Sequence, residues 1–253
     1  DRLVATASTE TVPAAWHAQL APGGRLVVPL RLSAVLFAVQ AVLAFAKVPG
    51  GFDSVEVTAG GFMALRGPGD RHAASATVVA RESADPAGER PLVEMSGPAI
   101  AALDTAARRR LVVTALGFAR RRPLELDGMS SWALGAYAAL ALPQERLVEC
   151  ARPVWTTAGE HALGVVDPVD GSVAFLLAGR RPRIEAHGGR GAEHSLLNVV
   201  DRWHLAGRPG VERLQVKVRY GSERPHAWRS VRRGDQWIAL DWRPAPPAGR
   251  RRG

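Results

Sequence analysis

The sequence predicts an α/β fold, because its first thirty residues have the pattern of a strand–helix–strand unit. A short apolar strand at Leu3–Ala5 precedes a helical segment in which Trp16 and Leu20, four residues apart, share one face. A Pro-Gly-Gly turn at 22–24 ends this helix, and a second apolar strand follows at Leu26–Leu30. Two strands joined by a helix in this way run parallel in a βαβ unit.

The next elements extend this unit to about residue 70. Strands are expected at Val42–Lys47 and Ser54–Thr58, on either side of a Pro-Gly-Gly turn that favours a hairpin. Pro29, near the end of the second strand, suggests a sheet edge or a strand end. A cluster of glycine and proline at 67–70 marks a boundary, so residues 1–70 are expected to form the first domain.

The region 71–243 is expected to form an appended α+β domain. Asp170-Gly171 lies between two apolar runs and favours a hairpin. The tail 244–253 is rich in proline, glycine and arginine and is expected to be disordered. The apolar patterns predict helices at 100–116, 131–142 and 192–204, and strands at 75–80, 92–95, 164–166, 172–177, 214–220 and 237–242.

The composition is that of a globular protein with a net positive charge. Apolar residues make up 47% of the 253 residues, and the formal net charge is +9. The arginines are scattered and do not alternate with aromatic residues, which argues against a surface for single-stranded nucleic acid. The arginine triplets Arg108–Arg110 and Arg120–Arg122 are expected to be solvated faces, although positive charge can also attract acidic peptides.

Other classes of protein are disfavoured by what the sequence contains. Cys150 is the only cysteine, which excludes a disulfide framework and fits a reducing cytoplasm, where we expect the protein to act. The longest uncharged run, Leu32–Ala46, is shorter than the roughly 18–20 residues that span a bilayer, so we expect core and no membrane contact. The histidines lack metal-site spacing, and Ser130 and Ser131 lack the G-x-S-x-G pattern of a hydrolase.

Four segments together resemble the C-terminal half of protein-L-isoaspartate O-methyltransferases. They are DRLVATA at Asp1–Ala7, the VP turn at Val12-Pro13, QLAPGGRLVVP at Gln19–Pro29, and FMAL at Phe62–Leu65. The resemblance implies the C-terminal part of a Rossmann-like class I methyltransferase sheet. The remainder of the chain is similar to the extra C-terminal region of long family members from high-GC bacteria.

The resemblance implies transfer of a methyl group from S-adenosylmethionine to an isoaspartyl or aspartyl carboxylate of a protein or peptide. A carboxylate is already a nucleophile at pH 7, so orientation supplies much of the catalysis and no metal is needed. By resemblance, Thr6 and Ala7 border the cofactor at the C-terminal end of the first strand. Val12, Pro13, Pro29 and Leu30 would shape the substrate groove. A plain strand-to-helix connection and a helix-start proline explain several of these residues equally well.

The catalytic parts of the family pattern do not map onto this sequence. The glycine-rich cofactor loop, the acidic residue after the second strand and the Ser/Thr motif for the carboxylate precede the segment that matches Asp1. Gly50-Gly51 and the glycines at 188–191 lack G-x-G-x-x-G spacing, and Ala64 replaces a family proline. We therefore expect a fragment whose catalytic residues lie upstream and which is inactive alone. A non-catalytic peptide-binding module is the alternative.

Overall fold

The computed structural model describes residues 1–33, 39–60, 77–81, 91–151, 161–178 and 181–244. The chain divides into two compact units, and the second is inserted into the first. Unit 1 consists of residues 1–68 and 209–253, and unit 2 consists of residues 69–208. Within the described residues, no helix is long and apolar enough to cross a membrane.

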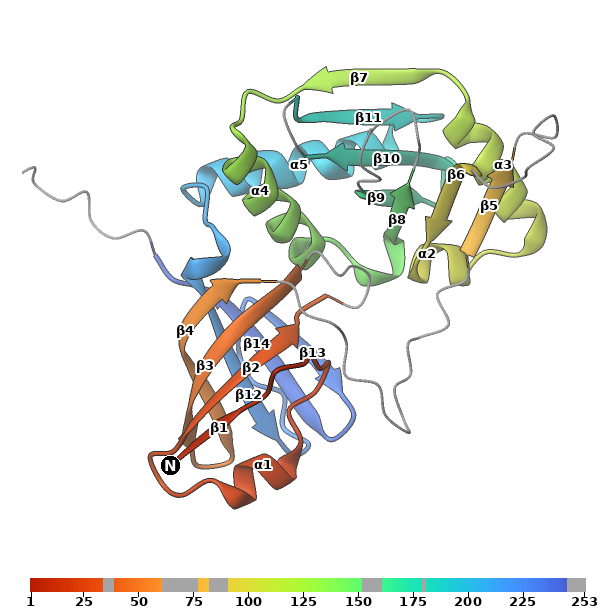
Figure 1. Cartoon of the computed structure of the whole chain (residues 1–253). Helices are drawn as coiled ribbons and strands as arrows, with labels where there is room; N and C mark the ends of the chain where they lie inside the picture. The colour runs from red at the N-terminus through yellow and green to blue at the C-terminus, as the bar shows by residue number, and fades with distance from the viewer. Residues whose placement is uncertain (34–38, 61–76, 82–90, 152–160, 179–180, 245–253) are drawn as a thin grey trace, which may run out of the picture. The chain divides into compact units, whose positions relative to one another are not determined.

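Unit 1 is built on a seven-stranded sheet in the order β1-β2-β3-β4-β12-β14-β13 (Figure 1). Only β1 and β2 pair parallel, and every other pair in this sheet is antiparallel. The strands are β1 (Arg2–Val4), β2 (Arg25–Arg31), β3 (Gln40–Val48), β4 (Gly51–Ala59), β12 (Leu214–Tyr220), β13 (Arg229–Arg233) and β14 (Gln236–Trp242).

The predicted βαβ unit is present. Helix α1 (Ala14–Gln19) joins β1 to the parallel strand β2 and begins directly after Pro13. Strands β3 and β4 form the predicted hairpin, with Val48 opposite Gly51 at the turn. The fold class is therefore mixed α/β, as the sequence predicts, although the parallel part of this sheet is confined to two strands among the described residues.

The two ends of the chain meet in one sheet. Strand β12 pairs antiparallel with β4, with Lys217 opposite Asp53. Along β12, Leu214, Val216 and Val218 are fully buried at alternate positions, so one face of the strand joins the core of unit 1. This differs from the expected division into 1–70 and 71–243, because 214–242 completes the first sheet. The sequence predicted strands at 214–220 and 237–242, but it did not show that the first of them pairs with β4.

Pro29 lies two residues before the end of β2, so the predicted position near a strand end is correct, although β2 is an inner strand of the sheet. The Ala5 amide donates to the Val27 carbonyl and the Thr9 amide donates to the Pro29 carbonyl, both from the β1 side. The nitrogen and the carbonyl of one strand residue point to the same side, so the Pro29 nitrogen also faces the β1 side. There the chain leaves the ladder between Ala5 and Thr9, and no backbone donor is required of Pro29.

Unit 2 contains a second seven-stranded sheet, in which all pairs are antiparallel, in the order β5-β6-β8-β9-β10-β11-β7. Its strands are β5 (Thr77–Arg81), β6 (Pro91–Ser96), β7 (Ala119–Pro123), β8 (Leu147–Ala151), β9 (His161–Asp167), β10 (Ser172–Leu177) and β11 (Arg183–His187). Its α-helices are α2 (Pro98–Ala101), α3 (Thr105–Leu116), α4 (Gly128–Ala141) and α5 (Gly191–Leu205).

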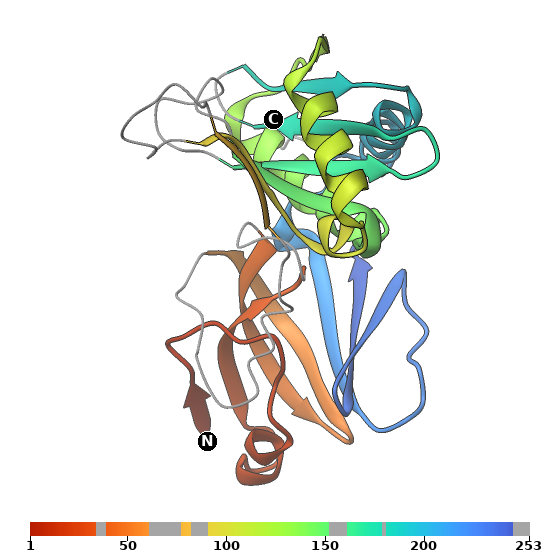
Figure 2. The ribbon, with the colours of Figure 1, turned by 90° about the vertical axis from the view of Figure 1, so that its right-hand side faces the viewer.

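Helices cover both faces of the second sheet. Helix α3 and helix α5 lie on opposite faces (Figure 2). Phe175 of β10 and Leu111 of α3 belong to one buried apolar cluster. Helix α5 is amphipathic and buries Leu196, Val200 and Trp203 along one side. The predicted hairpin at Asp170-Gly171 is present as β9 and β10.

The sequence reading missed or merged several elements. The predicted helix at 100–116 is two helices, because Asp104 caps α3 by accepting a hydrogen bond from the Ala107 amide at 2.7 Å. Strands β7, β8, β11 and β13 were not predicted. Strand β7 was hidden by its arginines, which do not form a merely solvated face. Arg120 and Arg122 pair with Glu193 at 3.0 and 2.5 Å.

Parts of the sequence-based reading lie outside the described residues. They include the FMAL segment at 62–65 that contains Ala64, and the tail from 245 to 253.

Candidate functional site

The β1–α1 loop, residues 5–13, is the strongest candidate for a ligand-binding segment. It begins where β1 ends, at the edge where open α/β sheets bind their ligands. Between Ala5 and Thr9 the chain leaves the β2 ladder, and it returns where the Arg31 amide donates to the Thr9 carbonyl at 2.9 Å. Thr6 and Ala7 form this excursion, beside the stretch of β2 that contains Pro29 and Leu30.

The structure thus brings together the residues that the family resemblance singled out, but it exposes them unequally. Thr6 and Pro13 are exposed and Ala7 is half-buried, whereas Pro29 is buried. Val12 and Leu30 have no exposed surface. In this conformation Thr6 and Pro13 can contact a ligand directly, whereas the buried residues support the wall behind them. Their assignment to cofactor and substrate stays a prediction.

Arg233 of β13 holds the C-terminal part of the loop through backbone carbonyls. Its Nη1 donates to the Glu10 carbonyl at 2.7 Å and to the Arg31 carbonyl, and its Nη2 donates to the Leu32 carbonyl at 3.1 Å. Glu10 itself forms an ion pair with Arg31. One guanidinium therefore joins the loop, the end of β2 and Leu32 to a strand more than 200 residues away in sequence.

Two further side chains from the C-terminal strands fix the end of the loop. The Val12 amide donates to Oε1 of Gln236 at 3.0 Å, and the Tyr220 hydroxyl donates to the Val12 carbonyl at 2.9 Å. The same hydroxyl lies 3.3 Å from the Pro13 carbonyl. We call Tyr220, Arg233 and Gln236 the C-terminal clamp.

The clamp side chains are in an environment poor in water. Burial lowers the pKa of Arg233 to about 10, with the neighbouring Arg31 and Arg229 acting in the same direction and Glu10 opposing them. The group therefore remains charged at neutral pH. Burial also raises the pKa of Tyr220, so its hydroxyl keeps its proton and donates.

Sequence reading could not find the clamp. Its members lie on β12, β13 and β14, and nothing in their local sequence points to residues 5–13. The one usable signal was polar character at buried positions: Gln236 is 1% exposed although it begins an apolar strand. A buried polar side chain needs a partner, and its partner here is the Val12 amide.

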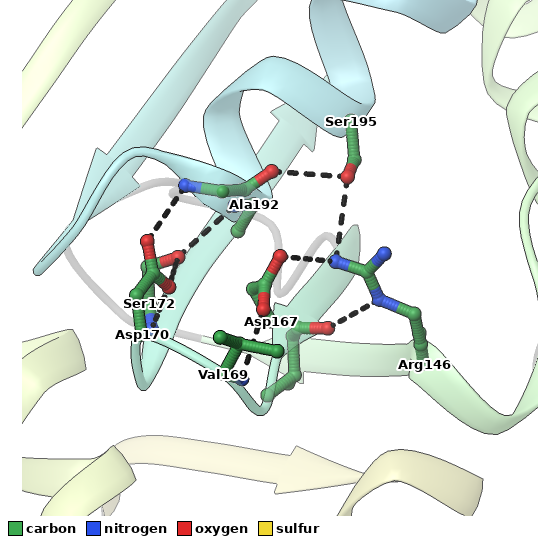
Figure 3. Close-up of polar contacts among 9 residues, drawn as sticks. Arg146, Asp167, Val169, Asp170, Ser172, Ala192 and Ser195 are labelled. Atoms are coloured by element: carbon green, nitrogen blue, oxygen red, sulfur yellow. Dashed lines mark hydrogen bonds and ion pairs between the residues drawn. The ribbon is translucent and has the colours of Figure 1, made fainter.

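A polar cluster in unit 2 contains the kinds of side chain found in active sites. Two carboxylates, two hydroxyls and a guanidinium lie close together there (Figure 3). Asp170 accepts hydrogen bonds from the Ser172 amide, the Ser172 hydroxyl and the Gly191 amide, at 3.0, 2.5 and 2.8 Å. The Ser172 hydroxyl accepts from the Ala192 amide at 3.0 Å. These bonds satisfy the first amides of α5, so Asp170 and Ser172 serve the N-terminus of that helix.

The rest of this cluster joins the same hairpin to α5. Arg146 donates from Nη2 to Asp167 at 2.9 Å and to the Ser195 hydroxyl at 3.3 Å, and from Nε to the Val166 carbonyl at 2.9 Å. Burial alone would raise the pKa of Asp170, but the hydrogen bonds from Ser172 and Gly191 outweigh it and lower the pKa. These contacts fix the β9–β10 hairpin to the N-terminal part of α5.

The glycines at 188–191 belong to this arrangement. A Cβ on Gly189 would lie 2.3 Å from Oδ2 of Asp170, and one on Gly191 would lie 2.4 Å from Oδ2 of Asp167. Glycine is needed there because the backbone passes directly over two carboxylates. Gly50 and Gly51 form the turn between β3 and β4. These packing and turn roles account for the glycines of both segments.

Two polar residues at the start of α4 have structural roles. Asp127 is the N-cap of α4 and accepts from the Ser130 amide at 2.7 Å, which lowers the pKa of Asp127. Ser131 donates to the Gly128 carbonyl at 2.9 Å. No group of three or more His, Cys, Asp or Glu side chains in the described ranges could hold a metal ion.

Replacing Arg233 should destabilise unit 1. In Arg233→Met, three carbonyls lose a charged donor, and hydrogen bonds to charged groups contribute about 1.5–3 kcal/mol each. Because water replaces part of this loss, we expect a decrease of about 3 kcal/mol in the free energy of unfolding, measured in urea at the amide signals of β2 and β3. The neighbouring Arg232→Met removes an exposed arginine of the same strand and should change stability by less than about 0.5 kcal/mol. An equal loss of stability in the two variants would show that the Arg233 hydrogen bonds do not stabilise unit 1.

Replacing Asp170 should destabilise unit 2 in a pH-dependent way. Asp170→Asn removes one of two acceptor oxygens and the charge at the α5 N-terminus, a loss of about 1–2 kcal/mol at pH 7. Because the pKa of Asp170 is lowered on folding, this stability is present above about pH 4 and is lost as pH falls through the folded pKa. In urea unfolding, the difference in free energy of unfolding between the variant and wild type should be smaller below pH 4 than at pH 7. Asp201→Asn, on the exposed side of α5, is the control, and a pH-independent gap would contradict this account.

Comparisons with known proteins bear on the first of these sites. Residues 1–49 match the family model described as protein-L-isoaspartate(D-aspartate) O-methyltransferase. A solved structure titled protein-L-isoaspartate O-methyltransferase aligns with 94% of this chain at 16% sequence identity and a TM-score of 0.33. The chain spans about half of that protein's length, 52%. No curated protein matches the chain.

The matched segment contains β1, α1, β2 and β3, and therefore the whole β1–α1 loop. The resemblance that the sequence analysis drew from DRLVATA, the VP turn and QLAPGGRLVVP is thus confirmed over residues 1–49: this part of the chain is similar to protein-L-isoaspartate O-methyltransferases.

Proposed function

We propose that this chain contributes the substrate side of an S-adenosylmethionine-dependent O-methyltransferase that esterifies isoaspartyl or aspartyl carboxylates in proteins or peptides. The observation that carries the proposal is that the family match and the local structure fall on the same residues. The match covers residues 1–49, and these residues contain the parallel strands β1 and β2 and the β1–α1 loop.

The position of the loop supports this assignment. Ligands of open α/β sheets bind beyond the C-terminal ends of parallel strands, and the loop begins at such an end. Its exposed side chains, Thr6 and Pro13, offer one hydroxyl and one apolar ring. Behind them, Val12 and Leu30 are fully buried and fix the backbone, so the wall is preformed.

The chemistry requires little of the protein beyond this wall. S-adenosylmethionine supplies an activated methyl group on a sulfonium sulfur. The substrate carboxylate is ionised at pH 7, so it would need no general base to form a bond to that methyl carbon while the methyl–sulfur bond breaks and leaves S-adenosylhomocysteine. The protein must hold the two reactants in line and at short distance, which lowers the barrier by removing translational and rotational freedom. A loop fixed through Arg233, Gln236 and Tyr220 suits that task, because it does not need to be ordered when the substrate binds.

The residues described here fit a wall of the cofactor site and not the whole of it. The glycines at 188–191 pack on Asp167 and Asp170, and Gly50 and Gly51 form a hairpin turn. We therefore assign no cofactor contact and no catalytic step to these two segments. Thr6 and Ala7 remain our proposal for the residues that border the cofactor.

A methylation assay tests the proposal. The longest open reading frame that contains this sequence is expressed and incubated with tritiated S-adenosylmethionine and three peptides that differ at one position, isoaspartyl, aspartyl or asparaginyl. We expect base-labile methyl ester on the isoaspartyl or the aspartyl peptide and none on the asparaginyl peptide. The 253-residue chain alone should not bind S-adenosylmethionine measurably in calorimetry.

Each outcome of this assay has a separate meaning. Absence of base-labile label on both acidic peptides would overturn the methyltransferase assignment and leave a peptide-binding module as the remaining function. Micromolar binding of S-adenosylmethionine by the 253-residue chain would overturn the view that it forms only one wall of the cofactor site.

A further inference from the structure

A pocket of about 590 Å³ opens on unit 2 where the end of β7 lies beside the start of β11. A volume of this size is typical of pockets that hold a small molecule or a short stretch of peptide. Its lining combines guanidinium groups with apolar side chains and consists of Arg121, Pro123, Leu124, Leu126, Arg181, Pro182 and Arg183.

Strand pairing places two of the arginines on one face of the sheet. Arg121 of β7 lies directly opposite Glu185 of β11, and Arg183 precedes Glu185 by two residues. Both arginines donate from Nε to the same oxygen, Oε1 of Glu185, at 3.2 and 2.8 Å. The Glu185 side chain is 2% exposed, so it lies beneath the two guanidinium groups.

The pocket keeps an excess of positive charge and of hydrogen-bond donors. Three guanidinium groups line it, and Glu185 compensates only one positive charge. Within the part of the chain that the structure describes, Arg121 uses only Nε, and Arg183 uses Nε and, at 3.4 Å, Nη1. The Arg121 side chain is 64% exposed, so its two terminal nitrogens are open to a ligand.

The apolar lining limits which anion fits. Leu124 and Leu126 are half-buried on the segment that leaves β7, and the Leu124 amide donates to the Pro182 carbonyl at 2.9 Å, which holds the two sides of the pocket together. The acidic side chain between the two leucines, Glu125, is exposed and does not line the pocket. A ligand must therefore present an anion and an apolar group next to each other.

We infer that this pocket binds a peptide segment in which a carboxylate side chain lies beside an apolar one. Planar guanidinium groups can pair with carboxylates through two parallel hydrogen bonds. Arg121 and Arg183 each give the Glu185 carboxylate only one, from Nε to Oε1, so the exposed terminal nitrogens of Arg121 can make such a pair with a ligand. The carboxylate preference rests on the pocket alone. The choice of a peptide over another organic acid rests on the proposed function.

Binding of a defined probe tests the inference. The 253-residue chain is titrated with a fluorescein-labelled peptide of alternating leucine and aspartate, and with its leucine–asparagine twin, by fluorescence anisotropy at low salt. The test variant is Arg121→Gln with Arg181→Gln, which keeps Arg183 as the partner of the buried Glu185. The matched control is Arg109→Gln with Arg110→Gln, which removes the same charge from exposed positions of α3.

We expect the aspartate peptide to bind at least tenfold more tightly than its asparagine twin. The test variant should weaken this binding at least tenfold, and the control less than twofold. Equal loss in both variants would overturn the inference, because it would show a general charge effect. Displacement of the probe by inorganic phosphate more readily than by acetate would also overturn it in favour of a phosphate site. Neither result affects the methylation assay, so the two proposals fail separately.

Discussion

The guanidinium of Arg233 joins three segments of unit 1 at the place where its function is proposed. It donates to carbonyls of Glu10 in the β1–α1 loop, of Arg31 at the end of β2 and of Leu32, which follows β2. Those carbonyls cannot find partners in a regular sheet, because the chain leaves the ladder there. Burying a charge is costly unless it is hydrogen-bonded, and burying carbonyls without donors is costly as well. Each group relieves the penalty of the other, and this mutual dependence fixes the loop in one conformation.

The features that could be predicted from the sequence are those set by residues close together along the chain. The βαβ unit, the β3–β4 hairpin and the Asp170-Gly171 turn were predicted, because turn residues and apolar periodicity act over a few positions. The candidate loop was identified through the resemblance at residues 1–49. The clamp was not, since contacts across more than 200 residues leave no local pattern. Strand β7 was missed because its arginines, whose partners Glu185 and Glu193 lie over 60 residues away, read as a solvated surface.

In unit 2, as in unit 1, charged side chains join segments that are far apart in sequence. The buried groups in unit 2 are the carboxylates of Glu185 and Glu193. Glu193 is 4% exposed and lies between Arg120 and Arg122, whose hydrogen bonds lower its pKa against the opposing effect of burial. Glu185 has Arg121 and Arg183 on the other face of the same strands. The arginines of β7 thus alternate between a face that pairs with Glu193 and a face that pairs with Glu185. The pocket proposed above lies beside the arginines that pair with Glu185.

The last strands of the chain complete the sheet that carries the β1–α1 loop. Amide NMR can test this dependence by comparing a chain that ends at Arg208 with one that ends at Pro244. We expect the chain ending at Pro244 to keep dispersed signals throughout β2, β3 and β4. The chain ending at Arg208 should lose them while the signals of β8 to β11 remain. Dispersed β2–β4 signals without β12, β13 and β14 would show that the first sheet forms without these strands.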